Sequence, residues 1–370
     1  MSHPTCDIAI IGAGVIGHSI AFRLKRTEPA LNVAVLGDPV NSLMASRAAA
    51  GMLAPFCECS QANRFFRFCR TSLDLYPAFV QELQKVSGVR VPLSMAGSIM
   101  PRKAIGDQWE ERLAFFREQE VPHEVWTARE VRRRLPYLSE DCGDVIWVGE
   151  GQVNNRCLHD ALLAASRRLG VAILDQNVTG FIRDGTRIAG AVTDFGEVTA
   201  GKYVLASGSW SQQLARVLEV TLPLRPIKGQ MCRLRVEDHK LPYTIHGFLT
   251  YVAPWREGQG FVIGSTMEDV GFSPVVEEEV IRELIDAAAR LLPCLKTAPL
   301  IESWAGLRPA AEDRMPVMGP SARYSNLFYS TGHYRNGILQ TPHQADYLAA
   351  ALLGTLKDPI PEFDPFRYGL

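Results

Sequence analysis

Residues 6–17 read CDIAIIGAGVIG, an apolar run that leads into the three glycines Gly12, Gly14 and Gly17. A short apolar run is typical of a buried parallel strand, and the apolar spacing after the glycines is that of a helix. A second apolar run at residues 33–36 completes a strand, helix and strand of the size that binds a nucleotide. Glycines at this spacing allow a tight turn and the close approach of a pyrophosphate to the helix N-terminus. The segment therefore predicts a Rossmann-like domain.

The length and charge of the chain narrow its class. A chain of 370 residues exceeds what one hydrophobic core usually supports, so two joined domains are expected. The formal net charge of -1 argues against a global field that would attract nucleic acid or an anionic membrane. No signal sequence and no membrane span are recognised, so we expect a soluble protein of the cytoplasm.

The eight cysteines are scattered and include no Cys-x-x-Cys pair. We therefore expect reduced thiols and predict no metal site. Cys57 and Cys59 form a Cys-x-Cys pair. Without a second pair or clustered histidines nearby, the favoured interpretation is that both are ordinary helix or loop residues.

Further elements follow from apolar periodicity and turn residues. Helices are expected at residues 62–86, 107–120, 127–135, 156–169, 277–292 and 338–353. Strands are expected at residues 171–174, 178–183, 188–193, 203–206, 230–235, 249–253, 260–264 and 327–330. A hairpin turn is expected at Asp184 and Gly185.

The predicted fold is α/β, with a Rossmann-like dinucleotide-binding domain and an α+β domain that has a mainly antiparallel sheet. The end of the chain returns to the pattern of strand, glycine-flanked loop and helix. Both domains are therefore expected to be discontinuous. The dinucleotide-binding domain is assigned residues 1–90, 150–220 and 300–370, and the substrate-binding domain residues 91–149 and 221–299.

An acidic residue after the second strand of such a unit usually binds the ribose hydroxyls. The residue directly after the strand at 33–36 is Gly37, and the carboxylate is that of Asp38. Two interpretations are open, because Asp38 either binds the ribose or caps the turn before Pro39.

Four motifs carry a family resemblance: AAAGML at 48–53, ASGSWS at 206–211, WAGLRP at 304–309 and GHYRNGIL at 332–339. In this order they resemble the D-amino acid oxidase superfamily of FAD-dependent oxidoreductases, and within it the glycine oxidase family. The resemblance spans nearly the whole chain. One departure is Arg47, since that family usually has a small or hydroxyl residue just before the first motif.

The resemblance implies that FAD is bound without a covalent bond and that the α/β domain is the FAD-binding one. Together with the glycine loop and the open assignment of Asp38, it gives the expected cofactor-binding residues: Gly12, Gly14, Val15, Ile16, Gly17, Asp38, Ser46, Ala50, Gly51, Met52, Val178, Gly208, His333, Tyr334, Arg335, Asn336, Gly337, Ile338 and Leu339. The first amides of the last helix would face the flavin, where negative charge develops on reduction. His333 is assigned no catalytic role.

The family's substrate contacts match Tyr251, Arg308 and Arg335. A guanidinium is a planar fork that fits a carboxylate, and the Tyr251 hydroxyl adds a donor. Two arginines near one pocket would favour an anionic or doubly acidic substrate.

The expected reaction is hydride transfer to the flavin from a small amino acid or secondary amine such as glycine or sarcosine. The resulting imine hydrolyses to glyoxylate or another oxo acid, and oxygen yields hydrogen peroxide. Three alternatives stay open: an iminodiacetate-type oxidase, a flavin dehydrogenase that reduces a quinone or protein, and a nicotinamide-dependent dehydrogenase or nucleotide-binding module. We expect a homo-oligomer, with no nucleic-acid partner and no membrane span.

Overall fold

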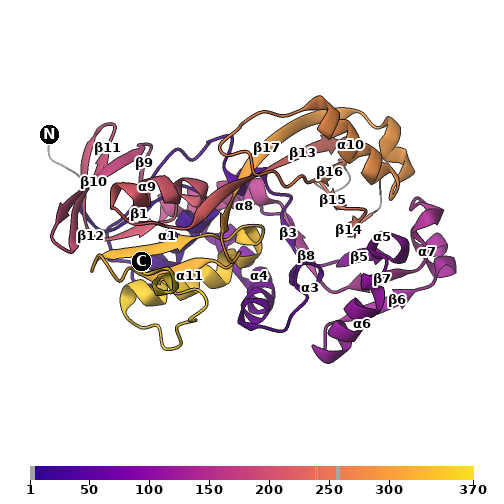
Figure 1. Ribbon diagram of the computed structural model, residues 1–370, viewed down its shortest axis with the longest axis horizontal. Helices are drawn as coiled ribbons and strands as arrows, with labels where there is room; N and C mark the ends of the chain where they lie inside the picture. Colours follow the sequence, from indigo (N-terminus) through magenta and orange to yellow (C-terminus); the bar gives the residue numbers. More distant parts are fainter. Residues whose placement is uncertain (1–4, 238, 240, 256–258) are drawn as a thin grey trace.

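The computed structural model describes residues 5–237, 239, 241–255 and 259–370, which form two large sheets and a small one. The first large sheet lies beside both chain termini, and the second extends toward the other end of the molecule (Figure 1). The predicted α/β class is confirmed. Among the described residues, no helix is both long enough and apolar enough to cross a bilayer.

The first sheet has the order β10-β11-β12-β1-β2-β9, and β19 joins it on β12 with β18 outside β19. Its strands are β1 (Thr5–Ile11), β2 (Val33–Leu36), β9 (Ala172–Leu174), β10 (Val178–Asp184), β11 (Arg187–Thr193), β12 (Gly196–Leu205), β18 (Val317–Pro320) and β19 (Leu327–Thr331). The neighbours β9, β2, β1, β12 and β19 are parallel. Their carboxyl ends therefore meet along one edge of the sheet.

Strand β1 shows why this sheet is buried on both faces. Ile8 and Ile10 pack with residues of α1 and α11, whereas Ala9 and Ile11 pack with residues that include those of α9. Successive side chains of a strand point to opposite faces, so an uninterrupted apolar run suits a strand covered on both sides.

The helices are α1 (Val15–Thr27), α2 (Ala45–Ala48), α3 (Pro55–Glu58), α4 (Arg64–Ser87), α5 (Arg102–Ile105), α6 (Gln108–Glu118), α7 (Ala128–Arg134), α8 (Asn155–Arg168), α9 (Ser211–Val217), α10 (Glu278–Ala289) and α11 (Gly337–Leu353). Helix α1 contacts α8 and α11, and α4 contacts the same two helices. Helices α1, α8 and α11 contact strands of the first sheet, and α4 packs on the outside of α8 and α11.

The second sheet has the order β17-β13-β16-β15-β14-β5-β7-β6. Its strands are β5 (Ser98–Pro101), β6 (His123–Trp126), β7 (Val145–Val148), β13 (Leu224–Leu234), β14 (Thr244–Gly247), β15 (Thr250–Pro254), β16 (Phe261–Gly264) and β17 (Leu300–Ala311). In the described part of the chain its pairs are antiparallel except β14 with β5. The small sheet joins β3 (Met52–Leu53), β8 (Gly151–Val153) and β4 (Leu93–Ser94).

Each expected helix and strand has a counterpart, and so has the hairpin turn, where Gly185 has a positive φ. The long strand β17 was not expected from the sequence. Residues 300–370 were assigned to the dinucleotide-binding domain, but Leu300–Ala311 pairs with β13 along its length in the second sheet. Strand β17 thus belongs to the second sheet and is its outermost strand, on the side nearest the first sheet.

Candidate active site

A pocket of about 480 Å³ lies where the carboxyl edge of the first sheet faces the second. Its walls include Ile11, Leu36 and Thr331, the last residues of β1, β2 and β19. The crevice outside the carboxyl ends of parallel strands is the usual ligand site of an open α/β sheet. Every predicted site residue lines the pocket except Gly17 and Leu339.

Steric contacts explain the glycine loop. A Cβ atom on Gly12 would lie 2.3 Å from the carbonyl oxygen of Ala206, and Gly12 has a φ of 130°. A Cβ atom on Gly17 would lie 1.9 Å from the Gly12 carbonyl oxygen. Gly17 therefore lets α1 pack against the loop without touching the pocket. The Val15 amide donates to the hydroxyl of Ser46 at 3.1 Å, which ties the start of α1 to α2.

Both interpretations of Asp38 are compatible with its position. Its side chain lines the pocket, while Oδ1 accepts a hydrogen bond from the Val40 amide at 2.7 Å. This bond makes the turn around Pro39. Ribose binding would use the other oxygen and stays a prediction.

Close contacts with β17 and with Val153 explain small residues at both ends of the run 48–51. Gly51 has a φ of 78°, and a Cβ atom there would lie 1.8 Å from the carbonyl oxygen of Val153. A Cβ atom on Gly306 of β17 would lie 2.3 Å from the Ala48 Cβ. The indole of Trp304 donates to the Ala48 carbonyl at 2.8 Å. The motif is thus held against β17.

Arg47, the departure from the family pattern, is not among the lining residues. Its Nη1 lies 2.7 Å from Asp160 Oδ1 and 3.3 Å from His159 Nδ1. The second ring nitrogen of His159 lies 2.8 Å from the Ala13 carbonyl oxygen. Arg47 therefore contacts the glycine loop indirectly, through His159, on the side away from the pocket.

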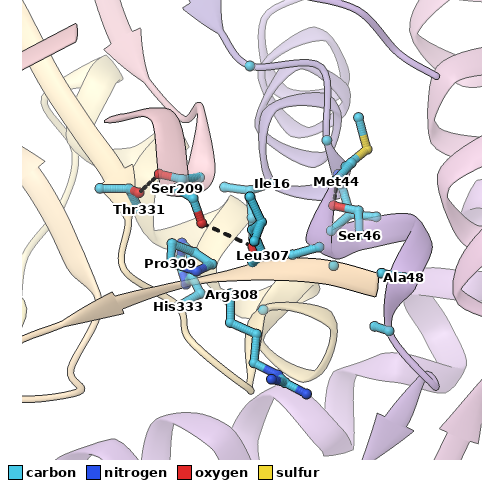
Figure 2. A pocket seen from close by; sticks show the side chains of 18 of the residues that line it. Ile16, Met44, Ser46, Ala48, Ser209, Leu307, Arg308, Pro309, Thr331 and His333 are labelled. Atoms are coloured by element: carbon cyan, nitrogen blue, oxygen red, sulfur yellow. Dashed lines mark hydrogen bonds between the residues drawn. The ribbon is translucent and has the colours of Figure 1, made fainter. Parts of the chain in front are cut away.

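On another side of the pocket, side-chain hydrogen bonds link the turn at residues 208–210 to strands of both large sheets. Ser209 Oγ donates to the Leu307 carbonyl at 3.0 Å, and Thr331 Oγ1 donates to the Gly208 carbonyl at 3.1 Å (Figure 2). Gly208 has a φ of 54°, which favours glycine at this turn. Ser209 and Thr331 were not predicted, although Ser209 lies inside one of the four motifs.

Helix α11 begins at the pocket with the amides of Gly337, Ile338 and Leu339, and none of these has an acceptor among the described residues. Pro342 has no N–H for the Ile338 carbonyl. The Tyr76 hydroxyl donates to that carbonyl instead. Leu339, which does not line the pocket, is 1% exposed and anchors this turn in the core. The helix therefore begins with free amides, two of which belong to the pocket-lining residues Gly337 and Ile338.

His333 is buried and hydrogen-bonded. Its Nδ1 lies 2.6 Å from Gln340 Oε1, and its Nε2 lies 3.4 Å from Ser330 Oγ. Burial lowers the pKa of His333 to about 4, so the ring is neutral at neutral pH. These bonds agree with a structural rather than a catalytic role.

Arg308 extends from β17 into the pocket, away from Ser209 and Thr331 (Figure 2). Its guanidinium donates to Ser265 Oγ at 2.6 Å and to the Thr266 carbonyl at 3.0 Å. No carboxylate pairs with it among the described residues. Burial lowers its pKa from the usual range, yet an arginine stays protonated in proteins. The pocket therefore contains a cation without an anionic partner.

Two glycines that the sequence did not single out make room for the predicted substrate contacts. A Cβ atom on Gly229 would lie 2.2 Å from Arg308 Nη2. A Cβ atom on Gly264 would lie 2.5 Å from the Tyr251 hydroxyl. Tyr251 is 7% exposed, and burial raises its pKa, so the hydroxyl is protonated and able to donate.

Arg335 differs from Arg308 because it has an acidic partner. Its Nη2 lies 2.6 Å from Glu58 Oε1, and both side chains line the pocket. Both arginines line the pocket as expected, but the charge of Arg335 is paired with that of Glu58. Glu58 gave no signal in the sequence, since it lies 277 positions before Arg335 in the chain.

The residues present fit a flavin dinucleotide. The glycine loop leaves space for a pyrophosphate, the small residues at 48–51 let backbone approach a flat ring, and the free amides of α11 suit developing negative charge. Fold and pocket together define a dinucleotide-binding α/β protein with a second sheet facing the cofactor.

The family follows from comparison with known proteins. The model of the DAO family, the FAD dependent oxidoreductases, matches residues 7–351, and the chain belongs to this family. The predicted superfamily and its FAD cofactor are thereby confirmed.

Relatives and solved structures agree with this assignment. The chain is 35% identical to the bifunctional protein ThiO/ThiG of Trichormus variabilis over 96% of its length, and it spans 54% of that protein. It is 31% identical to glycine oxidase of Pseudomonas aeruginosa, covering 98% of this chain and 97% of the relative. The crystal structure of glycine oxidase from Geobacillus kaustophilus superposes with a TM-score of 0.91 at 28% identity, covering 98% of both chains.

Proposed function

We propose that this chain is an FAD-dependent oxidase of a small amino acid or a small secondary amine that carries one carboxylate. The observation that carries the proposal is Arg308, a cation in the pocket that has no anionic partner in the described residues. A buried charge is stable only when it is paired, and a substrate carboxylate supplies the missing anion. Glycine oxidases among the relatives support the substrate class.

The proposed binding mode uses two side chains. The guanidinium of Arg308 binds the carboxylate, and the Tyr251 hydroxyl donates to it from β15. A carboxylate fixed at this point leaves the α carbon free to face the ring-binding residues at 48–51. Bound FAD supplies a two-electron acceptor for the hydride of that carbon.

The rest of the reaction needs little from the protein. The free amides at the start of α11 stabilise the negative charge that develops on the cofactor side. The substrate amine enters neutral, and the imine hydrolyses with water. No general base is assigned, which agrees with the bonded, neutral His333.

The pairing of Arg335 with Glu58 favours a substrate with one carboxylate over a diacid. The two charges cancel, so Arg308 is the one unpaired cation of the proposed substrate contacts. A second carboxylate would have to displace Glu58 from Arg335. An iminodiacetate-type oxidase is the second candidate, because Arg335 does line the pocket.

Oxygen is the proposed electron acceptor, with hydrogen peroxide as the product, and a flavin dehydrogenase with a quinone or protein acceptor is the alternative. We also propose a cytoplasmic homo-oligomer, with the domains divided as the sequence suggested except for β17. The eight free cysteines support a reducing compartment.

Product analysis tests the proposal. Purified holoenzyme is supplied with glycine, sarcosine, iminodiacetate and a panel of D-amino acids in air, and oxo acid, peroxide and oxygen uptake are measured together. An oxidase gives one peroxide for each oxo acid. If oxo acid forms only when an artificial quinone is added, the enzyme is a dehydrogenase and not an oxidase. Iminodiacetate preferred over sarcosine would favour the second candidate.

A further inference from the structure

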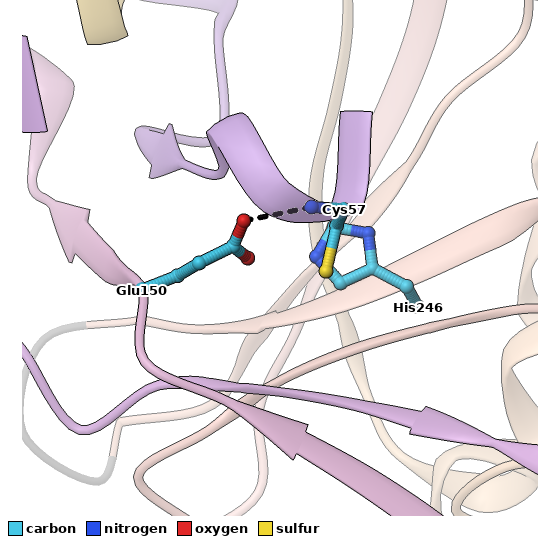
Figure 3. A group of neighbouring side chains, drawn as sticks. All are labelled: Cys57, Glu150 and His246. Atoms are coloured by element: carbon cyan, nitrogen blue, oxygen red, sulfur yellow. Dashed lines mark hydrogen bonds between the residues drawn. The ribbon is translucent and has the colours of Figure 1, made fainter. Parts of the chain in front are cut away.

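Three potential metal ligands meet outside the flavin pocket. Cys57 comes from α3, Glu150 from the loop between β7 and β8, and His246 from β14. One ligand atom from each lies within 4.8 Å of the other two. Figure 3 shows the Glu150 carboxylate directed at α3, with the Cys57 sulfur beside the His246 ring. None of the three residues lines the flavin pocket.

Glu150 is fully buried and only half satisfied. Its Oε1 accepts hydrogen bonds from the amides of Phe56 and Cys57, at 2.6 and 2.8 Å. Its Oε2 is also buried and accepts no hydrogen bond from the described residues, although the Ser98 hydroxyl and the Cys57 thiol lie near the carboxylate. An unpaired carboxylate oxygen in the interior is costly, so this atom calls for a ligand. The bonds to Oε1 fix the direction in which Oε2 points.

His246 adds a second unsatisfied atom. Its Nε2 is buried without a partner in the described part of the chain. An unprotonated ring nitrogen of imidazole is a common metal ligand, and the buried, unpartnered Nε2 is available for this role. Its backbone pairs with that of Tyr251 in the ladder between β14 and β15, which fixes the position of its Cα atom.

We infer that Cys57, Glu150 and His246 bind one divalent cation of the zinc class, through Sγ, Oε2 and Nε2. Thiolate, imidazole and carboxylate are the ligands that Zn²⁺ takes, and a site of three protein ligands keeps its fourth position for water. Tetrahedral bonds of zinc length put ligand atoms about 3.5 Å apart. The ligand atoms would therefore have to approach one another by about 1.3 Å at most from the separation seen here.

The charges of this site balance. Binding releases the Cys57 thiol proton to solvent, and the thiolate and the Glu150 carboxylate then neutralise the cation. Arg112 lies nearby, but its guanidinium is held by the carbonyl oxygens of Phe56 and Cys59, at 3.2 and 2.6 Å. The cation would thus satisfy both orphaned atoms without burying a net charge.

The test uses the yellow holoenzyme after chelator treatment and desalting. Zinc binding is measured by equilibrium dialysis, as the number of zinc ions bound per chain and the dissociation constant. One equivalent is expected in the wild type, with affinity at least tenfold weaker in Cys57→Ser and in His246→Gln. Cys59→Ser and Cys294→Ser are the matched controls, one a buried neighbour and one an exposed thiol, and both are expected to bind like the wild type.

Cobalt provides a signature that a merely structural cysteine would not give. Co²⁺ added to the wild type should show the absorption of a four-coordinate site with a thiolate ligand, at wavelengths longer than those of the flavin. The bands should be absent in Cys57→Ser, whose flavin content reports that the variant is folded. No binding by the wild type, wild-type affinity in folded Cys57→Ser and His246→Gln, or loss of binding in Cys294→Ser would each overturn the inference.

Discussion

Replacing Arg308 with alanine removes the cation on which the proposed substrate class depends. Truncating one member of a buried, charge-assisted pair costs about 2–5 kcal/mol, and about 1.4 kcal/mol corresponds to tenfold. Arg308→Ala is therefore expected to lower kcat/KM by about 30-fold to about 4,000-fold. The hydrogen bonds to Ser265 and Thr266 orient the Arg308 guanidinium but do not neutralise its charge. This charge is therefore available to a substrate carboxylate.

The assay for Arg308 measures oxo acid formation at several substrate concentrations, with flavin content determined in parallel. Flavin should stay bound, because Arg308 extends from β17 on the side of the substrate contacts. Arg308→Lys keeps the charge but loses the fork and should fall between wild type and alanine. An amine without a carboxylate is the control substrate, for which the loss should vanish. A kcat/KM for Arg308→Ala close to that of the wild type, with a carboxylate substrate, would refute the reasoning.

Three further predictions concern the cofactor, the specificity and the pH dependence. Gly51→Val should abolish flavin retention, because its Cβ would meet the Val153 carbonyl at 1.8 Å; the ratio of flavin to protein absorbance checks this, and full occupancy would contradict it. Glu58→Gln should free Arg335 and raise kcat/KM for iminodiacetate relative to sarcosine by about tenfold; an unchanged ratio would mean that Arg335 does not reach the substrate. Burial lowers the pKa of His333 from about 6.5 to about 4, so its contribution to stability is full above the higher value and falls as the pH drops through this window. His333→Asn should therefore make Tm less dependent on pH between these values, and a slope as steep as that of the wild type would exclude His333 as a cause.

The nucleotide-binding half could be predicted because its signals are local. Glycines at Gly12 and Gly17 follow a buried strand and precede a helix, and the structure shows the backbone contacts that require them. Short apolar runs identified the parallel strands for the same reason. Strand β17 was not predicted, because its pairing with β13 joins segments distant in sequence and leaves no periodic trace in residues 300–311.

The missed parts of the site come from residues distant in sequence. Glu58 meets Arg335 across 277 positions, and Glu150 reaches the amide of Cys57 across 93. Gly229 matters only because β13 brings it beneath Arg308. Such pairings depend on the assembled sheets, so a single sequence shows the chemistry of each residue without its partner.

Anaerobic reduction of the flavin tests the central claim most directly. The yellow holoenzyme is mixed without oxygen with glycine, sarcosine, iminodiacetate or a D-amino acid, and the flavin absorbance is followed. The account predicts that a small amino acid or secondary amine with one carboxylate bleaches the flavin, and that admitted oxygen restores the colour. A flavin that none of these compounds bleaches would contradict the assignment of Arg308 and Tyr251 as contacts of an amino acid carboxylate.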